Sequence, residues 1–420
     1  MSLSPFGIED MNVYAGVACV DVRELARRRG LDMQRFDNLL MDQKSVALPW
    51  EDPVTYALNA AAPIVDRLSE AERESIELLI FCSESAIDFS KSMSSYCHKH
   101  LGLSRRCRSF EIKAACYSGV AGLQMALNTV AATSGSKTRA LVIASDISRN
   151  VLEPGGDALS EDWSFAEPSG GAGAVAVLVG PDPQICQFDI GANGMHTYEV
   201  MDTCRPVPDS EAGDTDLSLL AYLECCEMSF RDYQRRVEDV TYAGSFSYLA
   251  FHTPFGGMVK GAHRQMMRRF ENPDAASTEH DFQERVGPGL RFSRRIGNTM
   301  GAAMLVSLAS IADHVLPGAA QRVGCFSYGS GCCSEFFSVV LSPGANERIR
   351  RHTISARLDS RLQLSMAQYE DFLVENGSIR FGTRNAKFSD MRDRLRVRTS
   401  SEGLFFLDGI REFHRDYVRG

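Results

Sequence analysis

Apolar runs of strand length alternate with helical patterns along most of the chain, separated by short turns that contain Gly and Ser. The predicted strands are ELLIFC (77–82), ALVIAS (140–145), AVAVLVG (174–180), SYLAFH (247–252) and GCFSYG (324–329). The segments VAGLQMALNTVAAT (120–133) and MGAAMLVSLASIADHV (300–315) have helical spacing. This alternation predicts an α/β fold with largely buried sheets.

The two halves of the chain repeat one arrangement. In the first half, a small-residue turn that contains Cys116 leads into an Ala/Leu-rich helix, and in the second half RRIGN (294–298) leads into a similar helix. Each half then closes with a strand after Gly-rich sequence, SGGAGAVAVLVG and SYGSGCCSEFFSVVL. The repetition favours two related α/β halves. We predict their boundary in the polar stretch 181–193, giving the units 1–185 and 186–420.

Three polar segments interrupt this pattern. We interpret 154–170 and 205–216 as surface or active-site loops, and 272–289 as a cap on one face of the second half.

Composition and charge narrow the class of protein. A chain of 420 residues exceeds what one hydrophobic core usually serves. The net charge of -9 argues against a general nucleic-acid binder, because phosphates are neutralised by a surplus of Lys and Arg. There is no apolar stretch of membrane-spanning length, and the N-terminal sequence lacks the pattern of a secretory signal. We therefore expect a cytoplasmic protein without a membrane segment.

The 12 cysteines do not indicate a metal site. Cys225-Cys226 and Cys332-Cys333 are adjacent pairs, and no His/Cys cluster has zinc spacing. We interpret most of the thiols as small, reduced core residues.

Cys116 differs because it precedes a helix within EIKAACYSGVAGLQMA. Free backbone N–H groups and the helix dipole would lower the pKa of a thiol there and raise its nucleophilicity. Ser118 and Gly119 leave room for an acyl chain, and main-chain amides can hold an oxyanion. The alternative is one more buried cysteine, and we prefer a catalytic role.

Glu84 follows an apolar strand in FCSESAIDFSKS. Burial beside a strand end predicts a raised carboxyl pKa, and such a group can remove a proton from an acyl thioester and return it. The alternative is a helix cap or a surface acid. Asp88, four residues later, is predicted to share a helical face with Glu84 and to support it.

His252 ends a strand in LAFHTPFGGMVKGAHRQ, and Pro254 restricts Thr253 to an extended conformation. The imidazole at the strand tip can polarise a carbonyl. Alone, it would more simply be a structural histidine. Lys260 lies about two helical turns further on, suited either to a phosphate at a site entrance or to solvent.

Two further polar groups are candidates through their neighbours. Asn298 follows Gly297 at a helix start, where asparagine is a common N-cap, although it can also donate to a carbonyl near Cys116. The run 327–331 (SYGSG) begins with Ser327 and is small and flexible enough to line a pantetheine tunnel.

Taken together, these segments resemble the 3-hydroxy-3-methylglutaryl-CoA synthase family of the thiolase superfamily. The motifs that carry the resemblance, in order, are ESAIDFSKS, ACYSG, EPSGGAGAVAVLVGP, FHTPFGGMVK, RRIGNTMGAAMLVSLAS and FSYGSG, from Gly7 to about Leu341. It implies a thiolase-like fold of two related halves in an αβαβα layering, and a homodimer. It also implies catalytic Cys116, Glu84 and His252, supporting Asp88, Asp146 and Asp202, and substrate contacts from Asn298 and Ser327.

The implied reaction joins an acetyl group on Cys116 to a β-ketone and then hydrolyses the thioester. It needs no metal or redox cofactor. Both substrates are carried on phosphopantetheine of a carrier protein or CoA.

Within this family, the chain looks most like the polyketide β-branching synthases, through RGLDMQRFDNLLMDQKSVALPWEDPVTYALNAA, HLGLSRRCRSFEIKAACYSG and IASDISR. Those enzymes act on donor and acceptor acyl carrier proteins. Because carrier proteins are acidic, the basic residues Arg27, Arg28, Arg29 and Arg35 become candidates for docking; the alternative is a solvated helix face.

One position departs from the family pattern. Ala114 stands where many members have Gln or Asn before the ACY triplet. We interpret it either as neutral drift or as room for a longer donor such as propionyl.

Three alternative functions stay open. A ketoacyl synthase III or chalcone-synthase type enzyme would read its Cys-His-Asn set onto Cys116, His252 and Asn298, and would not need Glu84. The others are a primary-metabolism synthase that uses acetyl-CoA and acetoacetyl-CoA, and a catalytically silent partner of carrier proteins.

Overall fold

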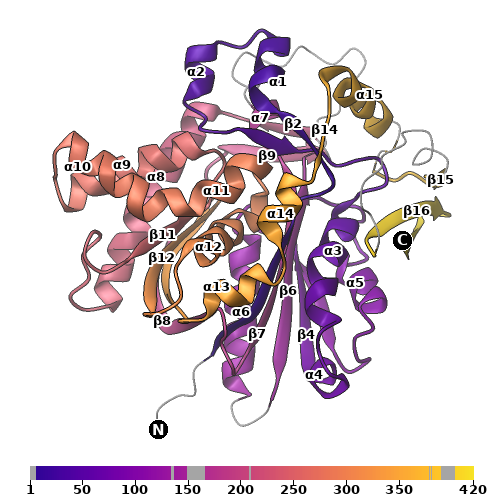
Figure 1. Cartoon of the computed structure of the whole chain (residues 1–420), viewed down its shortest axis with the longest axis horizontal. Helices are drawn as coiled ribbons and strands as arrows, with labels where there is room; N and C mark the ends of the chain where they lie inside the picture. The colour runs from indigo at the N-terminus through magenta and orange to yellow at the C-terminus, as the bar shows by residue number, and fades with distance from the viewer. Residues whose placement is uncertain are drawn as a thin grey trace.

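The computed structural model describes residues 6–133, 137–148, 166–207, 210–377, 379, 381–388 and 403–420. Within these ranges the chain forms an α/β fold around one large mixed sheet (Figure 1). No helix in the described ranges has the length and apolarity needed to cross a membrane.

The large sheet has nine strands in the order β11-β12-β13-β8-β1-β7-β6-β4-β5. In that order the strands are Tyr248–Phe251, Gln321–Gly329, Cys333–Leu341, Cys186–Thr197, Gly7–Tyr14, Ala172–Gly180, Arg139–Ile147, Ile76–Cys82 and Arg108–Ile112. Every strand predicted from the apolar runs is present in this sheet. Strands β4, β5 and β6 are parallel, as are β11 and β12, and the remaining pairs are antiparallel.

The helices and the sheet form five layers, which run from left to right in Figure 1. Helices α8 and α9 cover the strands β11, β12, β13 and β8; α6 and α12 form the centre; β1, β7, β6 and β4 follow; α3 and α5 lie outside them. These helices are α8 Thr215–Arg236, α9 Gly256–Phe270, α6 Ser118–Ala132, α12 Ala303–His314, α3 Pro53–Val65 and α5 Ser94–His100. The layering confirms the predicted αβαβα thiolase-like architecture.

The two halves of the large sheet are joined by a short strand pairing. Strand β1 pairs with β8 only through Gly7–Gln187 and Ile8–Cys186. Apolar side chains from both sides of this junction pack against α6 and α12 in one continuous core. The predicted units 1–185 and 186–420 therefore share one sheet and one core at the β1–β8 pairing.

The two central helices begin close together, and glycine permits the approach. A Cβ atom on Gly119 would lie 2.1 Å from the carbonyl oxygen of Gly301, nearer than two unbonded heavy atoms can come. Glycine has no Cβ and therefore lets the backbones meet. Gly301 belongs to a short 3-10 turn, η3 (Met300–Ala302), that precedes α12. The predicted helix 300–315 thus starts as a 3-10 turn.

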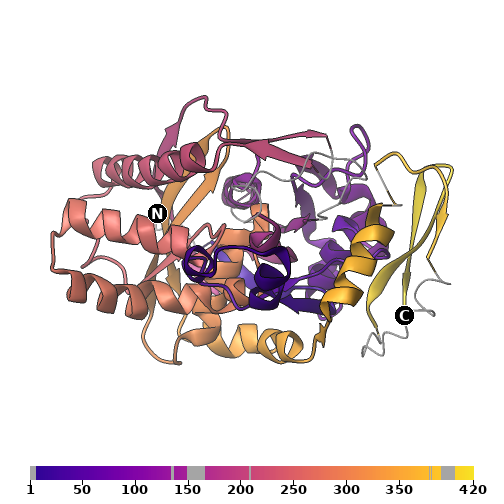
Figure 2. The ribbon, with the colours of Figure 1, turned by 90° about the horizontal axis from the view of Figure 1, so that it is seen from above.

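The last part of the chain returns to the first half. Strand β14 pairs with β2, and the α15 and β16 segments pack in a second core with α3. Seen from above, β16 and β17 stand at the opposite end of the molecule from α8–α10 (Figure 2). The smaller strands are β2 Ala18–Asp21, β3 Gln43–Ser45, β9 Thr203–Val207, β10 Ser210–Gly213, β14 Leu362–Gln363, β15 Ala386–Lys387, β16 Phe405–Arg411 and β17 His414–Arg419. The other helices are α1 Val22–Arg29, α2 Met33–Asp37, α4 Glu70–Glu74, α7 Ala166–Ser169, α10 Ala275–Asp281, η2 Phe282–Val286, α11 Gly287–Ile296, α13 Ala345–Arg350, α14 Ile354–Asp359 and α15 Met366–Gly377.

Two of the three polar segments, the predicted loop 205–216 and the predicted cap 272–289, contain regular structure. Segment 205–216 is mostly the antiparallel pair β9–β10, followed by the start of α8. Segment 272–289 holds α10, the π-helical η2 and the start of α11, with Asp274 capping α10. Polar composition indicated a surface position correctly, but it does not exclude amphipathic helices or hairpins. Of segment 154–170, residues 154–165 lie outside the described ranges.

Candidate active site

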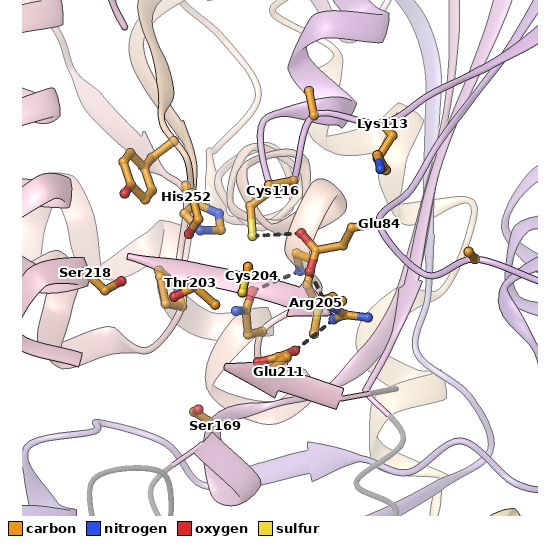
Figure 3. A pocket seen from close by; sticks show the side chains of 18 of the residues that line it. Glu84, Lys113, Cys116, Ser169, Thr203, Cys204, Arg205, Glu211, Ser218 and His252 are labelled. Atoms are coloured by element: carbon orange, nitrogen blue, oxygen red, sulfur yellow. Dashed lines mark hydrogen bonds and ion pairs between the residues drawn. The ribbon is translucent and has the colours of Figure 1, made fainter. Parts of the chain in front are cut away.

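A cavity of about 1030 Å³ opens where the central helices begin (Figure 3). Glu84 lies in it directly beyond β4, and His252 directly beyond β11. Both strands have parallel neighbours, and the carboxyl ends of parallel strands are common binding positions in α/β folds. Cys116 precedes α6, and Asn298 precedes the η3 turn of α12. The fold thus brings the three predicted catalytic side chains to one space.

The thiol of Cys116 lies 3.5 Å from Glu84 Oε2 and donates to it. Ala115, the preceding residue, has φ 45°, a left-handed conformation that is rare outside glycine and turns the cysteine toward the cavity. Burial, followed by the negative charges of Glu84 and Asp146, raises the pKa of the thiol well above its ordinary value.

The prediction of a lowered Cys116 pKa is therefore wrong. Helix α6 begins at Ser118, two residues beyond the sulfur, and the dipole effect is confined to the first turn. Burial and two carboxylates outweigh it. The resting thiol carries its proton and has a carboxylate acceptor beside it.

Glu84 has different partners on its two carboxylate oxygens. Oε2 accepts from the thiol, and Oε1 lies 3.0 Å from Arg205 Nη2 of β9. Burial raises the pKa of Glu84 to about 7, opposed by Arg205 and reinforced by Asp146 and Glu211. The predicted rise is confirmed. A carboxyl group with this pKa exchanges protons readily near neutral pH.

Asp146 organises the backbone beneath Glu84. Its Oδ1 accepts from Ser83 Oγ at 2.8 Å and from the N–H groups of Glu84 and Ser85 at 2.9 and 3.0 Å. Its Oδ2 accepts from the N–H of Gly301 at 3.0 Å. One fully buried carboxylate therefore ties the Glu84 segment to the start of α12.

His252 is held through its backbone. Its N–H donates to the Phe326 carbonyl at 2.7 Å, and its carbonyl accepts from Tyr222 Oη at 2.6 Å. Burial lowers the pKa of the imidazole to about 3, so the ring is neutral at physiological pH. The Nδ1 atom has no hydrogen-bond partner within the described residues. A neutral imidazole at a cavity wall can donate one hydrogen bond to a carbonyl.

Asp202 is hydrogen-bonded to the end of β12, whereas Ser327 belongs to that strand and is not among the cavity-lining residues. Asp202 accepts from Tyr328 Oη at 2.5 Å and from the Gly331 N–H at 2.9 Å. Ser327 is buried one residue before Tyr328, which lines the cavity. Asn298 lines the cavity, and its Oδ1 accepts from the Met300 N–H at 2.9 Å, a local capping contact.

Asp88 lies at the cavity wall but not on a helix. It is exposed and accepts from the N–H groups of Ser90 and Lys91, both at 2.7 Å, which closes a turn. The predicted shared helical face with Glu84 is wrong, because Ser and Asp side chains here bond their own backbone in place of a helix.

Three of the cationic candidates, Lys260, Arg28 and Arg29, form ion pairs with acidic residues. Lys260 Nζ lies 2.7 Å from Glu279 on α10, and Lys260 is not among the cavity-lining residues. Arg28 pairs with Glu370 at 3.0 Å. Arg29 pairs with both Glu167 and Glu370 at 2.8 Å. Arg27 is exposed, whereas the side chain of Arg35 lies outside the described part of the structure.

Three cavity-lining residues were not predicted individually. Arg205 and Glu211 face the cavity from β9 and β10. Their segment was interpreted as a surface or active-site loop, so the sequence indicated only the position of the segment. Lys113, which also lines the cavity, was likewise missed although it stands close to Cys116 in the nucleophile segment. Over the described ranges, no group of three or more His, Cys, Asp and Glu residues could hold a metal ion.

A five-layered α/β fold with a cysteine at the head of a central helix is that of a thiolase-type condensing enzyme. Residues 4–184 match the family model for the N-terminal part of hydroxymethylglutaryl-coenzyme A synthase, and residues 267–419 match that for its C-terminal part. The chain belongs to the hydroxymethylglutaryl-CoA synthase family, as its motifs predicted.

The similar proteins include enzymes of polyketide biosynthesis. The polyketide biosynthesis 3-hydroxy-3-methylglutaryl-ACP synthase PksG of Bacillus subtilis (strain 168) is 58% identical over 412 residues, 98% of each chain. The crystal structure of the curacin pathway HMG synthase in complex with holo donor-ACP has a TM-score of 0.94 at 54% identity, covering 99% of this chain and 100% of that one. The hydroxymethylglutaryl-CoA synthase of Enterococcus faecalis is 33% identical, over 88% of this chain and 91% of its own.

Proposed function

We propose that this enzyme performs β-branching in polyketide biosynthesis. It joins an acetyl group bound to Cys116 with the β-ketone of a β-ketoacyl group on an acyl carrier protein. The observation that carries the proposal is the 3.5 Å contact between Cys116 Sγ and Glu84 Oε2, in a cavity that His252 also lines. A nucleophile, a base and a carbonyl ligand thereby share one space.

The first step is transfer of the donor acetyl group. Because the thiol of Cys116 is protonated at rest, attack on the acetyl thioester moves its proton to the adjacent Glu84 carboxylate. The tetrahedral intermediate then expels the carrier thiolate, which takes a proton and leaves as the thiol. Acetyl-Cys116 and an ionised Glu84 remain.

The second step forms the carbon–carbon bond. Glu84 removes a proton from the acetyl methyl group, and the resulting carbanion equivalent attacks the β-ketone of the acceptor. His252, neutral in this site, donates a hydrogen bond to the ketone oxygen and orients it. Protonated Glu84 returns its proton to the new tertiary alkoxide.

Hydrolysis completes the cycle. Water attacks the thioester on Cys116, which regenerates the thiol and leaves a carboxylate on the branch. The product is a 3-hydroxy-3-methylglutaryl group that stays on the acceptor carrier. The substrates arrive on phosphopantetheine, and none of these steps requires a metal or a redox cofactor.

Similarity to PksG and to the curacin enzyme supports carrier proteins as the substrate form. We propose that the exposed residue Arg27 contributes to docking of the acidic carrier. Arg28 and Arg29 are less available because Glu370 and Glu167 already pair with them. Reversing the charge at Arg27 is expected to raise the apparent KM for the carrier and to leave kcat unchanged. An unchanged KM would remove Arg27 from the docking surface.

The deciding experiment is mass spectrometry of carrier-bound products. The enzyme is mixed with acetyl-carrier and acetoacetyl-carrier protein, beside a reaction with the corresponding CoA esters only. A 3-hydroxy-3-methylglutaryl group on the acceptor carrier, with little CoA product, is the expected result. Efficient turnover of the CoA pair would instead indicate a primary-metabolism synthase. A Cys116 that is never acylated would indicate a silent partner.

Glu84 separates the proposal from a decarboxylative condensing enzyme. Decarboxylation of a malonyl donor creates a carbanion without a base, so Glu84→Ala would leave such an enzyme active. Here we expect the substitution to abolish condensation while Cys116 still takes up acetyl groups.

Ala114, which lines the cavity, bears on the length of the donor acyl group. Faster loading from propionyl-carrier than from acetyl-carrier would support extra room at Ala114.

We further propose that the enzyme works as a homodimer in the cytoplasm. Strand β5 is the last strand of the large sheet, and an open sheet edge is a ready template for pairing with another chain. All twelve cysteines are free, which suits a reducing compartment. Light scattering of the purified protein tests the dimer, and cell fractionation tests the compartment.

A further inference from the structure

The guanidinium of Arg205 lies between two carboxylates at the edge of the active site. Its Nη2 atom is 3.0 Å from Glu84 Oε1 and 2.9 Å from Glu211 Oε1 (Figure 3). The Arg205 side chain is only 14% exposed, and that of Glu84 only 15%. Glu211 is more open, at 33%. In such a poorly hydrated position, charge–charge interactions are screened less than at the surface.

The contact with Arg205 also fixes the orientation of Glu84. Because Oε1 is engaged by the guanidinium, Oε2 is the oxygen that faces the sulfur of Cys116. The carboxylate plane cannot rotate freely without losing the ion pair. A base held in this way keeps one defined oxygen next to an acetyl group on that sulfur.

The charged and titratable groups around Glu84 come from several elements. Asp146 of β6 and Glu211 of β10 add negative charge, Cys116 contributes a protonated thiol, and His252 is neutral. Arg205 is the cation that lowers the pKa of Glu84 most, and Lys113 also lines the cavity. Loss of Arg205 would therefore leave three carboxylates close together without their counter-charge.

We propose that Arg205 is a positioning residue that keeps Glu84 ionised with Oε2 turned toward Cys116, and that Glu211 weakens this hold. The proposal rests on the function proposed above, in which Glu84 removes the methyl proton. Arg205 itself touches no reacting atom. Glu211 also pairs with the guanidinium of Arg205 and offsets part of its positive charge. The Arg205–Glu211 pair therefore sets how strongly Glu84 holds a proton.

The Arg205–Glu211 pair predicts the direction in which each substitution shifts the pH profile of proton abstraction. Burial raises the pKa of Glu84 to about 7, while Arg205 lowers it and Glu211 raises it. Proton abstraction requires the ionised carboxylate, so its rate rises with pH through this pKa. Arg205→Gln is expected to move the acidic limb of the profile to higher pH, by about one pH unit or more. Glu211→Gln is expected to move it to lower pH.

The test uses acetylated enzyme, in which the Cys116 thiol no longer titrates. Acetyl-carrier loads Cys116, the enzyme is transferred to heavy water at a series of pH values, and mass spectrometry follows deuterium entering the acetyl group. Arg205→Lys, which keeps the charge but not the fork geometry, should show a smaller shift of the limb than Arg205→Gln and a lower maximal rate. Arg106→Gln and Glu74→Gln are matched controls, since that pair has the same 2.9 Å separation on an exposed surface. Neither control should move the limb.

Shifts in the same direction for the Arg205 and Glu211 variants, or no shift in either, would overturn the proposal. If Arg205→Gln does not fold, Glu211→Gln at the more open position still decides the sign. Glu84→Gln separates this inference from the proposed function. Exchange that survives Glu84→Gln contradicts Glu84 as the base. A third outcome is exchange that is lost in Glu84→Gln but whose acidic limb is unshifted in Arg205→Gln and Glu211→Gln. That outcome rejects the role of Arg205 and leaves Glu84 as the base.

Discussion

Two buried carboxylates lie near the segment that carries Cys116, and their surroundings are opposite. Glu84 faces the cavity, bears an ion pair with Arg205 and accepts from the thiol of Cys116. Glu335 of β13 is 1% exposed and accepts from three neutral donors. These donors are Tyr117 Oη at 2.7 Å, Gln124 Nε2 at 2.8 Å and Asn193 Nδ2 at 3.2 Å.

Burial raises the pKa of both groups, yet only one of them is equipped for proton transfer. Glu84 has one face open to the cavity, and its cationic partner Arg205 also pairs with Glu211. Glu335 has no open face, and Tyr117, which follows Cys116 directly, is one of its donors. The carboxylate of Glu335 therefore acts as a fixed acceptor that joins the head of α6 to β8 and β13. A raised pKa alone does not distinguish a catalytic acid from a structural one; the partners do.

The largest expected effect belongs to Glu84. Glu84→Ala removes the base for proton abstraction and should lower kcat by roughly 10²- to 10⁴-fold. The melting temperature should change little, because Arg205 keeps Glu211 as a partner. Steady-state kinetics and thermal unfolding on the same preparation measure both. A large fall in stability with intact turnover would instead make Glu84 a structural residue.

Glu335→Ala should have the complementary outcome. Three donors would lose their acceptor, and Tyr117 is buried whereas Gln124 and Asn193 are half-buried. A buried group left unsatisfied costs about 1–3 kcal/mol. The expected result is a clear drop in the free energy of unfolding, with kcat of the folded fraction falling far less than in Glu84→Ala. Denaturant titration gives the stability. A kcat loss equal to that of Glu84→Ala would place Glu335 in the chemistry.

Tyr117→Phe sharpens the same contrast with a smaller change. It removes one of the three donors and keeps the ring, so we expect a loss of about 1 kcal/mol. The pH profile of deuterium exchange should stay that of the unmodified enzyme, since Glu84 keeps all its partners. A shifted profile would show that the two carboxylates are coupled through the head of α6.

Lys260→Ala should have the smallest effect. Its ammonium group pairs with Glu279 away from the cavity, and surface pairs are worth about 0–1 kcal/mol. Both kcat and the KM for carrier substrates are expected to match the unmodified enzyme. A raised KM for both donor and acceptor would restore Lys260 as a phosphate contact.

The sequence predicted most strands of the large sheet, the central helices and the residues that meet at the cavity, because those features depend on local pattern and on motif order. It did not identify β1, β5 and β8. It did not predict the partners of these residues. Arg205 reaches Glu84, and Glu335 reaches Tyr117, through tertiary packing alone. The Cys116 pKa was wrong for the same reason: a helix start is visible in sequence, whereas burial beside two carboxylates is not. The predicted helical position of Asp88 was wrong because its side chain accepts hydrogen bonds from the nearby backbone and closes a turn.

The hydrogen bonds of Asp146 have a consequence for the newly made protein. Its carboxylate joins the Ser83–Ser85 segment to the N–H of Gly301, far along the chain. A ribosome that has already released Cys116 and Glu84 must still synthesise more than half of the protein's remaining length before this fourth bond can form. The growing chain therefore carries a thiol without its finished site.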